Sequence, residues 1–222
     1  GRNMSSLGHH YAIHIYDLAT RFRGIYPVKT HHEIDVKLSL MEFMGKMKVR
    51  HIYSDNAPEI VSAVRSLGIP HSTSRPGRPH TNGVIERQNQ EMNRGTKAAL
   101  LQAGLPPHFW DCAMDHFAMS ENISGRLGPS PWKLRYNEDF WGVRIPFGAK
   151  VRFIPNETTA EGLSHPKLAP STVYGIFVGY EMAHGKWNGN YKTISLTDLE
   201  KIPLSIRAPA STARVNVNIV GE

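Results

Sequence analysis

The sequence predicts a mixed α/β domain that is followed by a small β-rich module. Three observations along the 222 residues support this order. Up to residue 123 the apolar residues change between the period of a strand and the period of a helix. Glycine and proline then gather between 124 and 146, where we place a domain boundary. Beyond it, short strand-like runs separated by turn residues indicate an all-β unit. The expected divisions are a core at 1–125, a linker at 126–145, a β-rich module at 146–198 and a tail at 199–222.

The expected elements of the first domain, in chain order, are strands at 11–16 and 22–28, a helix at 31–47, a strand at 49–54, a helix at 58–67, a strand at 69–73 and helices at 84–103 and 108–123. The two opening strands carry β-branched and aromatic residues in near-alternation, and their short connection predicts an antiparallel hairpin. The first helix follows from Ile34, Leu38 and Met41, which recur every three or four residues.

Turn-forming residues delimit the later elements. The third strand ends at Asp55, and Gly68 is placed to cap the short helix that follows. Residues 74–83 are dense in proline, glycine and asparagine, so we expect a loop there. The long helix after this loop stops at Gly104, and the next helix is rich in buried-type aromatic residues. In the second unit, strands are expected at 148–154, 173–180 and 191–197.

Composition narrows the class of protein. Lysine and arginine number 26 against 19 aspartate and glutamate, which gives a net charge of +7 and a pI of about 9.6. A basic balance favours a polyanionic partner, although many soluble proteins are mildly basic. Cys112 is the single cysteine, so an internal disulfide is excluded and a reducing compartment such as cytosol or nucleus is expected. The sequence contains no run of 18 apolar residues, so we expect no membrane span. We also expect no signal peptide.

Two acidic residues stand where metal chemistry is expected. Asp55 ends a strand and Glu86 lies in the first turn of the long helix. In a mixed sheet, the end of a central strand lies beside the start of a helix packed on that sheet, so the two carboxylates are expected to converge. Carboxylates are hard oxygen ligands suited to Mg²⁺ or Mn²⁺, which serve phosphoryl transfer. The alternative is structural: Asp55 caps a helix, and Glu86 interacts favourably with a helix dipole.

A series of motifs in fixed order resembles the integrases of copia-type LTR retrotransposons. The resemblance covers roughly residues 11–198, and a series in this order is more specific than any single motif. The matching segments are Tyr53-Ser54-Asp55-Asn56-Ala57-Pro58-Glu59, Gly68-Ile69-Pro70-His71-Ser72, Pro79-His80-Thr81-Asn82-Gly83-Val84-Ile85-Glu86-Arg87-Gln88-Asn89, Leu105-Pro106-Pro107-His108-Phe109-Trp110, Ser130-Pro131-Trp132, Pro146-Phe147-Gly148-Ala149-Lys150-Val151 and Gly175-Ile176-Phe177-Val178-Gly179-Tyr180.

The resemblance implies an RNase H-like mixed sheet with flanking helices, followed by a small β-barrel-like (SH3-like) module. It makes Asp55 and Glu86 the second and third acids of a DDE triad that binds Mg²⁺ or Mn²⁺. Two departures from the family pattern are a shorter gap before Gly68 and Asn56-Ala57 in place of Asn-Gly. Since only two strands precede the first helix, the resemblance also implies that the first strand and the first catalytic Asp lie upstream of Gly1.

This places Asp17 in a hairpin turn, or in a salt bridge, rather than at the metal; replacement of the missing acid by Asp17 is the alternative. The family comparison and the types of side chain also suggest a set of DNA contacts. They are Asn56, Arg75, Arg78, His80, Asn82, Arg87, Asn89, Asn93 and Lys97.

The implied function is metal-dependent DNA strand transfer, in which a 3′-hydroxyl of element cDNA attacks a phosphodiester of target DNA. The implied partners are element cDNA ends, target DNA and further copies of the chain, with no membrane and no small-molecule substrate. The implied location is the nucleus, with a cytoplasmic stage in virus-like particles. One alternative is a catalytically dead fragment that only binds DNA or assembles, and another is an RNase H-like nuclease.

Overall fold

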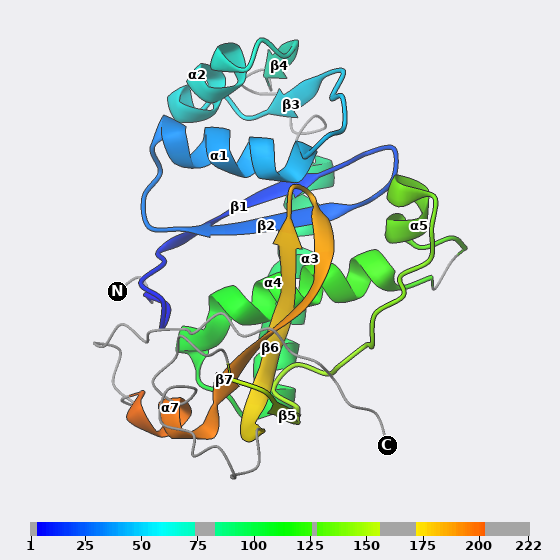
Figure 1. The fold of residues 1–222 in the computed structure, drawn as a ribbon. Coiled ribbons are helices and arrows are strands. Elements are labelled where there is room, and N and C mark those ends of the chain that lie inside the picture. The colour runs from blue at the N-terminus through cyan, green and yellow to red at the C-terminus, as the bar shows by residue number, and fades with distance from the viewer. Residues whose placement is uncertain (1–3, 74–82, 126–127, 156–171, 203–222) are drawn as a thin grey trace.

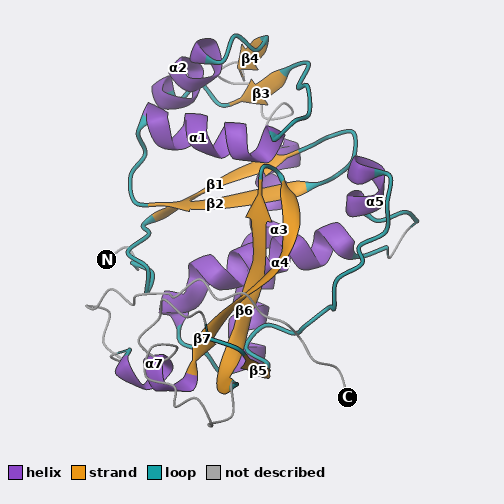
Figure 2. Ribbon diagram, in the orientation of Figure 1, coloured by secondary structure: helices purple, strands orange, loops and turns teal. Residues whose placement is uncertain are grey.

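The protein is described here by a computed structural model that covers residues 4–73, 83–125, 128–155 and 172–202. The elements of the first half are β1 (Tyr11–Tyr16), β2 (Arg23–Val28), α1 (Glu33–Met44), β3 (Ile52–Ser54), α2 (Pro58–Ser66), β4 (His71–Thr73) and α3 (Gly83–Ala103). Those of the second half are the 3-10 helix η2 (Pro107–Phe109), α4 (Trp110–Ile123), α5 (Pro131–Tyr136), β5 (Lys150–Phe153), β6 (Val173–Ala183), β7 (Lys186–Ser195) and α7 (Leu196–Lys201). Helices and strands alternate as expected, so the mixed α/β class is confirmed (Figures 1 and 2).

The predicted N-terminal hairpin is confirmed, and helices cover both of its faces. β1 and β2 are antiparallel, from the pair Tyr11–Val28 to the pair Tyr16–Arg23. On one face, Ile13 packs with α1 and α2 in a shared apolar cluster. On the other face, Ile25 packs against α3 and α4. The hairpin is therefore the layer that separates the two pairs of helices (Figure 1).

The helix predicted at 31–47 forms, but the expected buried face is wrong. Ile34 and Leu38, which suggested that face, are each 56% exposed. The face of α1 that packs into the core is instead formed by Val36, Leu40 and Phe43. Because apolar residues lie on both faces of this helix, the sequence pattern alone did not identify the face that the β1–β2 hairpin and α2 cover.

The strands predicted at 49–54 and 69–73 are shortened to β3 and β4, which pair in parallel from Ile52–His71 to Ser54–Thr73. The hydroxyl of Ser54 and Nε2 of His71 lie 2.9 Å apart and join the two strands by their side chains. Within the described residues, this pair and the β1–β2 pair are separate sheets rather than one continuous sheet.

The second unit is a three-stranded antiparallel sheet in the order β5-β6-β7. The strand predicted at 191–197 begins earlier, at Lys186, because Trp187 is buried in the core. Among the described strands β5 and β7 do not pair, so the sheet is open and a closed barrel is not observed. Two helices, α5 and α7, form in stretches where none was expected, and α7 runs past the predicted start of the tail at 199.

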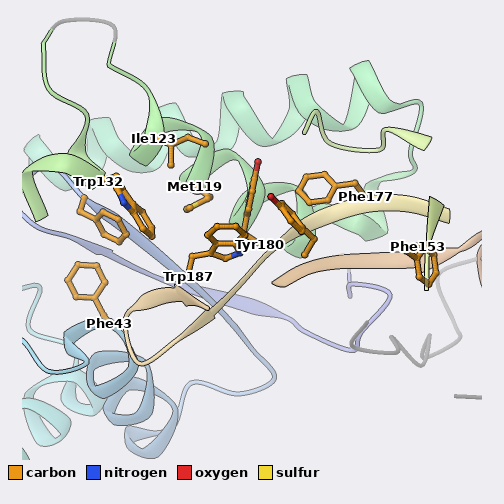
Figure 3. Close-up of a cluster of buried hydrophobic side chains, with 10 residues drawn as sticks. Phe43, Met119, Ile123, Trp132, Phe153, Phe177, Tyr180 and Trp187 are labelled. Carbon is orange, nitrogen blue, oxygen red and sulfur yellow. The ribbon is translucent and has the colours of Figure 1, made fainter. Parts of the chain in front are cut away.

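Aromatic side chains form a core that is shared by both units (Figure 3). Trp132 of α5, within the stretch expected to be a linker, is completely buried in this core. The buried members come from the hairpin turn, α1, α4, α5 and the three-stranded sheet, and they are Phe22, Phe43, Met119, Ile123, Trp132, Phe153, Phe177, Tyr180, Trp187 and Tyr191. This cluster therefore joins residues of both units. None of the helices in the described part of the chain has the length and apolar character needed to cross a membrane.

The turn of the β6–β7 hairpin docks on the C-terminal end of α1. Gly45 caps α1 with a φ of +53°, and a Cβ atom there would lie 2.0 Å from the carbonyl oxygen of His184 in this turn. The neighbouring Gly185 donates its N–H to a carboxylate oxygen of Glu42 at 3.4 Å. Figure 1 shows the hairpin extending from the sheet towards α1, so the C-terminal unit packs against the N-terminal unit at this turn.

A buried histidine in the core predicts loss of stability in mild acid. His116 of α4 is 8% exposed, and its Nε2 lies 3.0 Å from the carbonyl oxygen of Ile145. Burial lowers the pKa of His116, although the hydrogen bond to Ile145 and the charge of Asp115 oppose that shift. The folded state therefore takes up a proton less readily than the unfolded state, whose histidine has its ordinary pKa of about 6.5.

We expect the contribution of His116 to the free energy of unfolding to be constant above about pH 7. As the pH drops below about 6.5, the free energy of unfolding should fall. Urea unfolding between these pH values measures the slope. In His116→Gln the slope should decrease. Equal slopes in the unaltered protein and in His116→Gln would contradict the prediction.

Candidate metal and nucleic-acid site

Asp55 follows the last residue of β3 and opens the connection to α2. Its side chain is exposed, and Oδ1 accepts a hydrogen bond from the N–H of Ala57, the N-cap residue of α2, at 3.3 Å. This bond holds the backbone turn and uses one carboxylate oxygen. Among the described residues no hydrogen bond is recorded for Oδ2, so this oxygen is free to act as a ligand. The helix cap of the structural alternative does not form, because Ala57 is the N-cap residue of α2 and no side chain caps this helix.

Glu86 lies in the first turn of α3 and is exposed. Within the described part of the chain its carboxylate forms no hydrogen bond or ion pair. The opposite face of α3 is packed: Met92 is 1% exposed and Thr96 5% exposed. Packing of that face fixes the direction in which the polar face of the helix points.

Residues close to the two acids lie on opposite faces of β1. Ile52, three residues before Asp55, packs in the same cluster as Ile13. Asn89, three residues after Glu86, has its Oδ1 2.7 Å from Nδ1 of His14. Glu86 therefore lies three residues from a direct contact with β1, and Asp55 lies three residues from a member of the apolar cluster on the opposite face of that strand. The convergence of the two carboxylates themselves stays a prediction.

The proposed DNA contacts on α3 are on its exposed surface. Arg87, Asn93 and Lys97 are exposed, and none of them forms an ion pair with another described residue. Asn89 is exposed but is also held by His14, which leaves its amide nitrogen for another partner. Asn56 is exposed beside Asp55. The other four candidates, Arg75, Arg78, His80 and Asn82, lie outside the described residues.

His14 was not expected to be near the site. It is the residue of β1 that faces the polar start of α3, and burial lowers its pKa despite the hydrogen bond to Asn89. Alternation along β1 could have suggested that residue 14 points away from the side of Ile13 and Ile15, but not which helix it meets.

Asp17 occupies the turn between β1 and β2, as predicted. Its carboxylate accepts hydrogen bonds from the N–H of Ala19 at 3.0 Å and the hydroxyl of Thr20 at 2.6 Å. A guanidinium nitrogen of Arg135 lies 3.5 Å from the same carboxylate. The side chain of Arg135 is itself only 2% exposed and sits 4.3 Å from the ring centre of Phe43. These bonds give Asp17 a structural role in joining the hairpin to α5.

The expected metal site needs more ligands than the described residues bring together. Within the described residues no group of three or more His, Cys, Asp or Glu side chains is placed to hold a metal ion. Asp55 and Glu86 would supply two carboxylates, whose hard oxygen atoms suit Mg²⁺ or Mn²⁺. A complete site of the expected kind therefore needs a further ligand.

Curated relatives of the chain are polyproteins of plant transposons. The chain is 31% identical over 201 residues to the retrovirus-related Pol polyprotein from transposon TNT 1-94 of Nicotiana tabacum, which is 82% of this chain and 14% of that polyprotein. It is 28% identical over 135 residues to the corresponding polyprotein from transposon RE1 of Arabidopsis thaliana, which is 58% of this chain and 9% of the polyprotein. The chain thus spans a seventh or less of the length of these relatives. No protein-family profile matches it.

Solved structures with similarity to the chain include two integrase catalytic cores. The catalytic core domain of BIV integrase is 19% identical, with a TM-score of 0.42, over 55% of this chain and 90% of that one. The HTLV-2 integrase catalytic core domain in complex with magnesium is also 19% identical, with a TM-score of 0.44, over 57% of this chain and 93% of that one.

The mixed α/β fold and the sequence relatives together define the class: the chain is related to the Pol polyproteins of plant retrotransposons. Within that class, the motifs around Asp55 and Glu86 resemble those of copia-type integrases, and the similarity to plant transposon polyproteins agrees with that resemblance.

Proposed function

We propose that this chain is the part of a retrotransposon integrase that carries two of the three metal-binding carboxylates. Together with a third carboxylate it would catalyse metal-dependent strand transfer, in which a 3′-hydroxyl of element cDNA attacks a phosphodiester of target DNA. The observation that carries this proposal is the pair of exposed acids, Asp55 after β3 and Glu86 in the first turn of α3, in a chain related to Pol polyproteins.

The positions of the neighbouring residues support the pairing of these acids. Asn89, three residues after Glu86, contacts His14 of β1, and Ile52, three residues before Asp55, packs against the apolar cluster that also includes Ile13 of the same strand.

The strand pairing supports an RNase H-like arrangement for the proposed core. Among the described strands, β1 pairs only with β2, and β3 only with β4. A further strand between β1 and β3 would join the two pairs into one mixed sheet. Such a strand would end beside Asp55, which is where the third carboxylate of the proposed site is needed.

A bound Mg²⁺ or Mn²⁺ would neutralise charge on the reacting phosphate and activate the attacking hydroxyl. The residues of this chain would position the nucleic acid. Arg87, Asn93 and Lys97 on the exposed face of α3 are suited to phosphate oxygens and would orient the DNA beside Glu86. Element cDNA, target DNA and further copies of the chain are the proposed partners, and the nucleus is the proposed place of action.

Metal binding tests the assignment of the acids without requiring activity. We expect Mn²⁺ binding, followed by electron paramagnetic resonance, to weaken at least about tenfold in Asp55→Asn and in Glu86→Gln, because each removes an anionic ligand. Asp17→Asn is the matched control and should bind Mn²⁺ as the unaltered protein does, since Asp17 is engaged in the hairpin turn. If only Asp17→Asn bound Mn²⁺ more weakly, Asp17 rather than Asp55 or Glu86 would be the metal ligand.

Strand transfer is then measured with the chain preceded by the segment that the tobacco polyprotein carries before its matched region. Glu86→Gln should lower transfer by about a hundredfold or more, because a positioned charge that acts on the transition state is typically worth that much. Transfer that is unchanged in Glu86→Gln would refute the proposal.

A second function, DNA binding without catalysis, is favoured by one observation: the described residues alone contain no three-ligand cluster. It predicts salt-sensitive DNA binding together with no strand transfer in Mg²⁺ or Mn²⁺, even for the extended protein. Cleavage of RNA–DNA hybrids without joining of ends would instead indicate an RNase H-like nuclease.

A further inference from the structure

The first two turns of α3 extend beyond the packed part of that helix. Glu86 lies in the first turn, but the first fully buried residue of α3 is Met92, six positions later. Six residues of α-helix span about 9 Å. The residues between these two are exposed or only half-buried. Because the ends of helices fray unless tertiary contacts hold them, the position of Glu86 depends on the contacts that fasten this stretch.

Two polar contacts join this stretch to the β1–β2 hairpin. Nδ1 of His14 in β1 lies 2.7 Å from Oδ1 of Asn89, three residues after Glu86. A guanidinium nitrogen of Arg23 in β2 lies 2.9 Å from a carboxylate oxygen of Glu91. Within the described part of the chain, the bond to Asn89 is the side-chain hydrogen bond of α3 that lies nearest to Glu86 in sequence.

The donor in the bond to Asn89 is the imidazole of His14. An amide oxygen only accepts hydrogen bonds, so Nδ1 carries the proton. Burial lowers the pKa of His14, which keeps the ring neutral at pH 7 and leaves Nε2 without a proton. Nε2 is buried and has no hydrogen-bond partner among the described residues. The bond therefore selects one tautomer of the ring, and it leaves the N–H groups of the Asn89 amide for other acceptors.

His14 belongs to a part of the fold that is itself fixed. In the hairpin it is paired with Ile25 of β2, so the two side chains lie on the same face. Ile25 is 5% exposed and packs in one cluster with Met92. The imidazole therefore lies beside the place where α3 meets the core. Its hydrogen bond to Asn89 adds a contact that is three residues nearer to Glu86 than Met92 is.

We propose that His14 is a positioning residue of the metal site: by holding Asn89 it fixes the first two turns of α3 and thereby the place of the Glu86 carboxylate. This inference rests on the proposed function, because it requires Glu86 to be a metal ligand. His14 acts through Asn89 and not on the reacting groups. A carboxylate that is already in place binds a cation without first ordering the helix end, so loss of the His14 bond weakens metal binding.

Leucine and asparagine at position 14 form a matched pair, because they have nearly the same shape and only asparagine carries an N–H group near the place of Nδ1. In the 222-residue protein, His14→Leu should accelerate hydrogen exchange of the amides at 87–90 about fivefold, the effect of losing one hydrogen bond. Mn²⁺ binding should weaken severalfold, because the apparent affinity falls with the fraction of molecules whose helix end is ordered. His14→Asn should restore both. Amides of α4 should exchange as in the unaltered protein, which excludes a global loss of stability.

A double-mutant cycle shows whether the effect passes through Asn89. His14→Leu and Asn89→Leu should each weaken Mn²⁺ binding. The double variant should bind Mn²⁺ no more weakly than the weaker of the two single variants, because both changes remove the same hydrogen bond. Nuclear magnetic resonance of the ring nitrogens should show Nδ1 of His14 as the protonated nitrogen in the unaltered protein.

Three results would each overturn the inference. They are a His14 ring that carries its proton on Nε2, effects of the two substitutions that simply add, and unchanged Mn²⁺ binding in His14→Leu where Glu86→Gln weakens it. Failure of the proposed function gives a different result. Glu86→Gln would then leave Mn²⁺ binding unchanged, which also removes the metal-site role of His14, even where His14→Leu still accelerates exchange at 87–90.

Discussion

Replacement of Trp132 by alanine is expected to lower the free energy of unfolding by about 3–5 kcal/mol, the usual range for truncation of a large buried aromatic side chain. The indole is completely buried and contacts aromatic rings from several elements. Its ring centre lies 4.5 Å from that of Tyr136, 5.2 Å from that of Phe140 and 6.3 Å from that of Phe22. Removal of the ring would leave a cavity between the hairpin turn, α4 and α5, where rigid neighbouring rings limit collapse.

Urea unfolding of the 222-residue protein, followed by circular dichroism, measures this loss. Trp132→Phe should cost only about 1 kcal/mol, because it keeps much of the volume and the indole N–H has no hydrogen-bond partner among the described residues. Trp141→Ala is the matched control, since that tryptophan is 69% exposed. A similar loss in Trp141→Ala and Trp132→Ala would show that burial of Trp132 does not stabilise the fold.

The role of Trp132 illustrates what the sequence could and could not predict. The motif Ser130-Pro131-Trp132 belongs to the family resemblance, and Ser130 caps α5 by accepting a hydrogen bond from the N–H of Lys133 at 3.1 Å. The stretch was nevertheless expected to be a linker, because glycine and proline surround it. A helix of six residues has too short a period to be recognised, and its stability comes from tertiary packing rather than from its own sequence.

The site residues Asp55 and Glu86 were easier to predict from the sequence than the long-range contacts of the residues around them. Asp55 and Glu86 were identified from short local motifs, and the structure places them at the end of a strand and the start of a helix as expected. The contact between Asn89 and His14 joins residues 75 positions apart, and no local pattern encodes it. Likewise, α1 has apolar residues on both faces, so only the packing partners decide that Leu40 is buried and Leu38 is not.

A glycine at the junction between the two units gives the second large prediction. Gly45→Ala is expected to lower the free energy of unfolding by about 3 kcal/mol or more, from two sources. Gly45 has a φ of +53° and a ψ of −118°, outside the left-handed helical region, and an L-residue in so sparsely populated a conformation costs about 1–3 kcal/mol. In addition, the new Cβ atom would lie 2.0 Å from the carbonyl oxygen of His184, a backbone atom that cannot move away by a change of rotamer.

The variant Gly68→Ala separates the cost of the backbone conformation from the cost of the steric clash. Gly68 has a similar φ of +66° and also follows a helix, but nothing lies within 4 Å of its Cβ position. This variant should therefore lose only the conformational cost of about 1–2 kcal/mol. Hydrogen exchange locates the difference. Amides of the turn at 183–186 and of the end of α1 should exchange faster in Gly45→Ala but not in Gly68→Ala, because only the former separates the β6–β7 turn from α1. Equal destabilisation with unchanged exchange would mean that the two units do not brace each other at this contact.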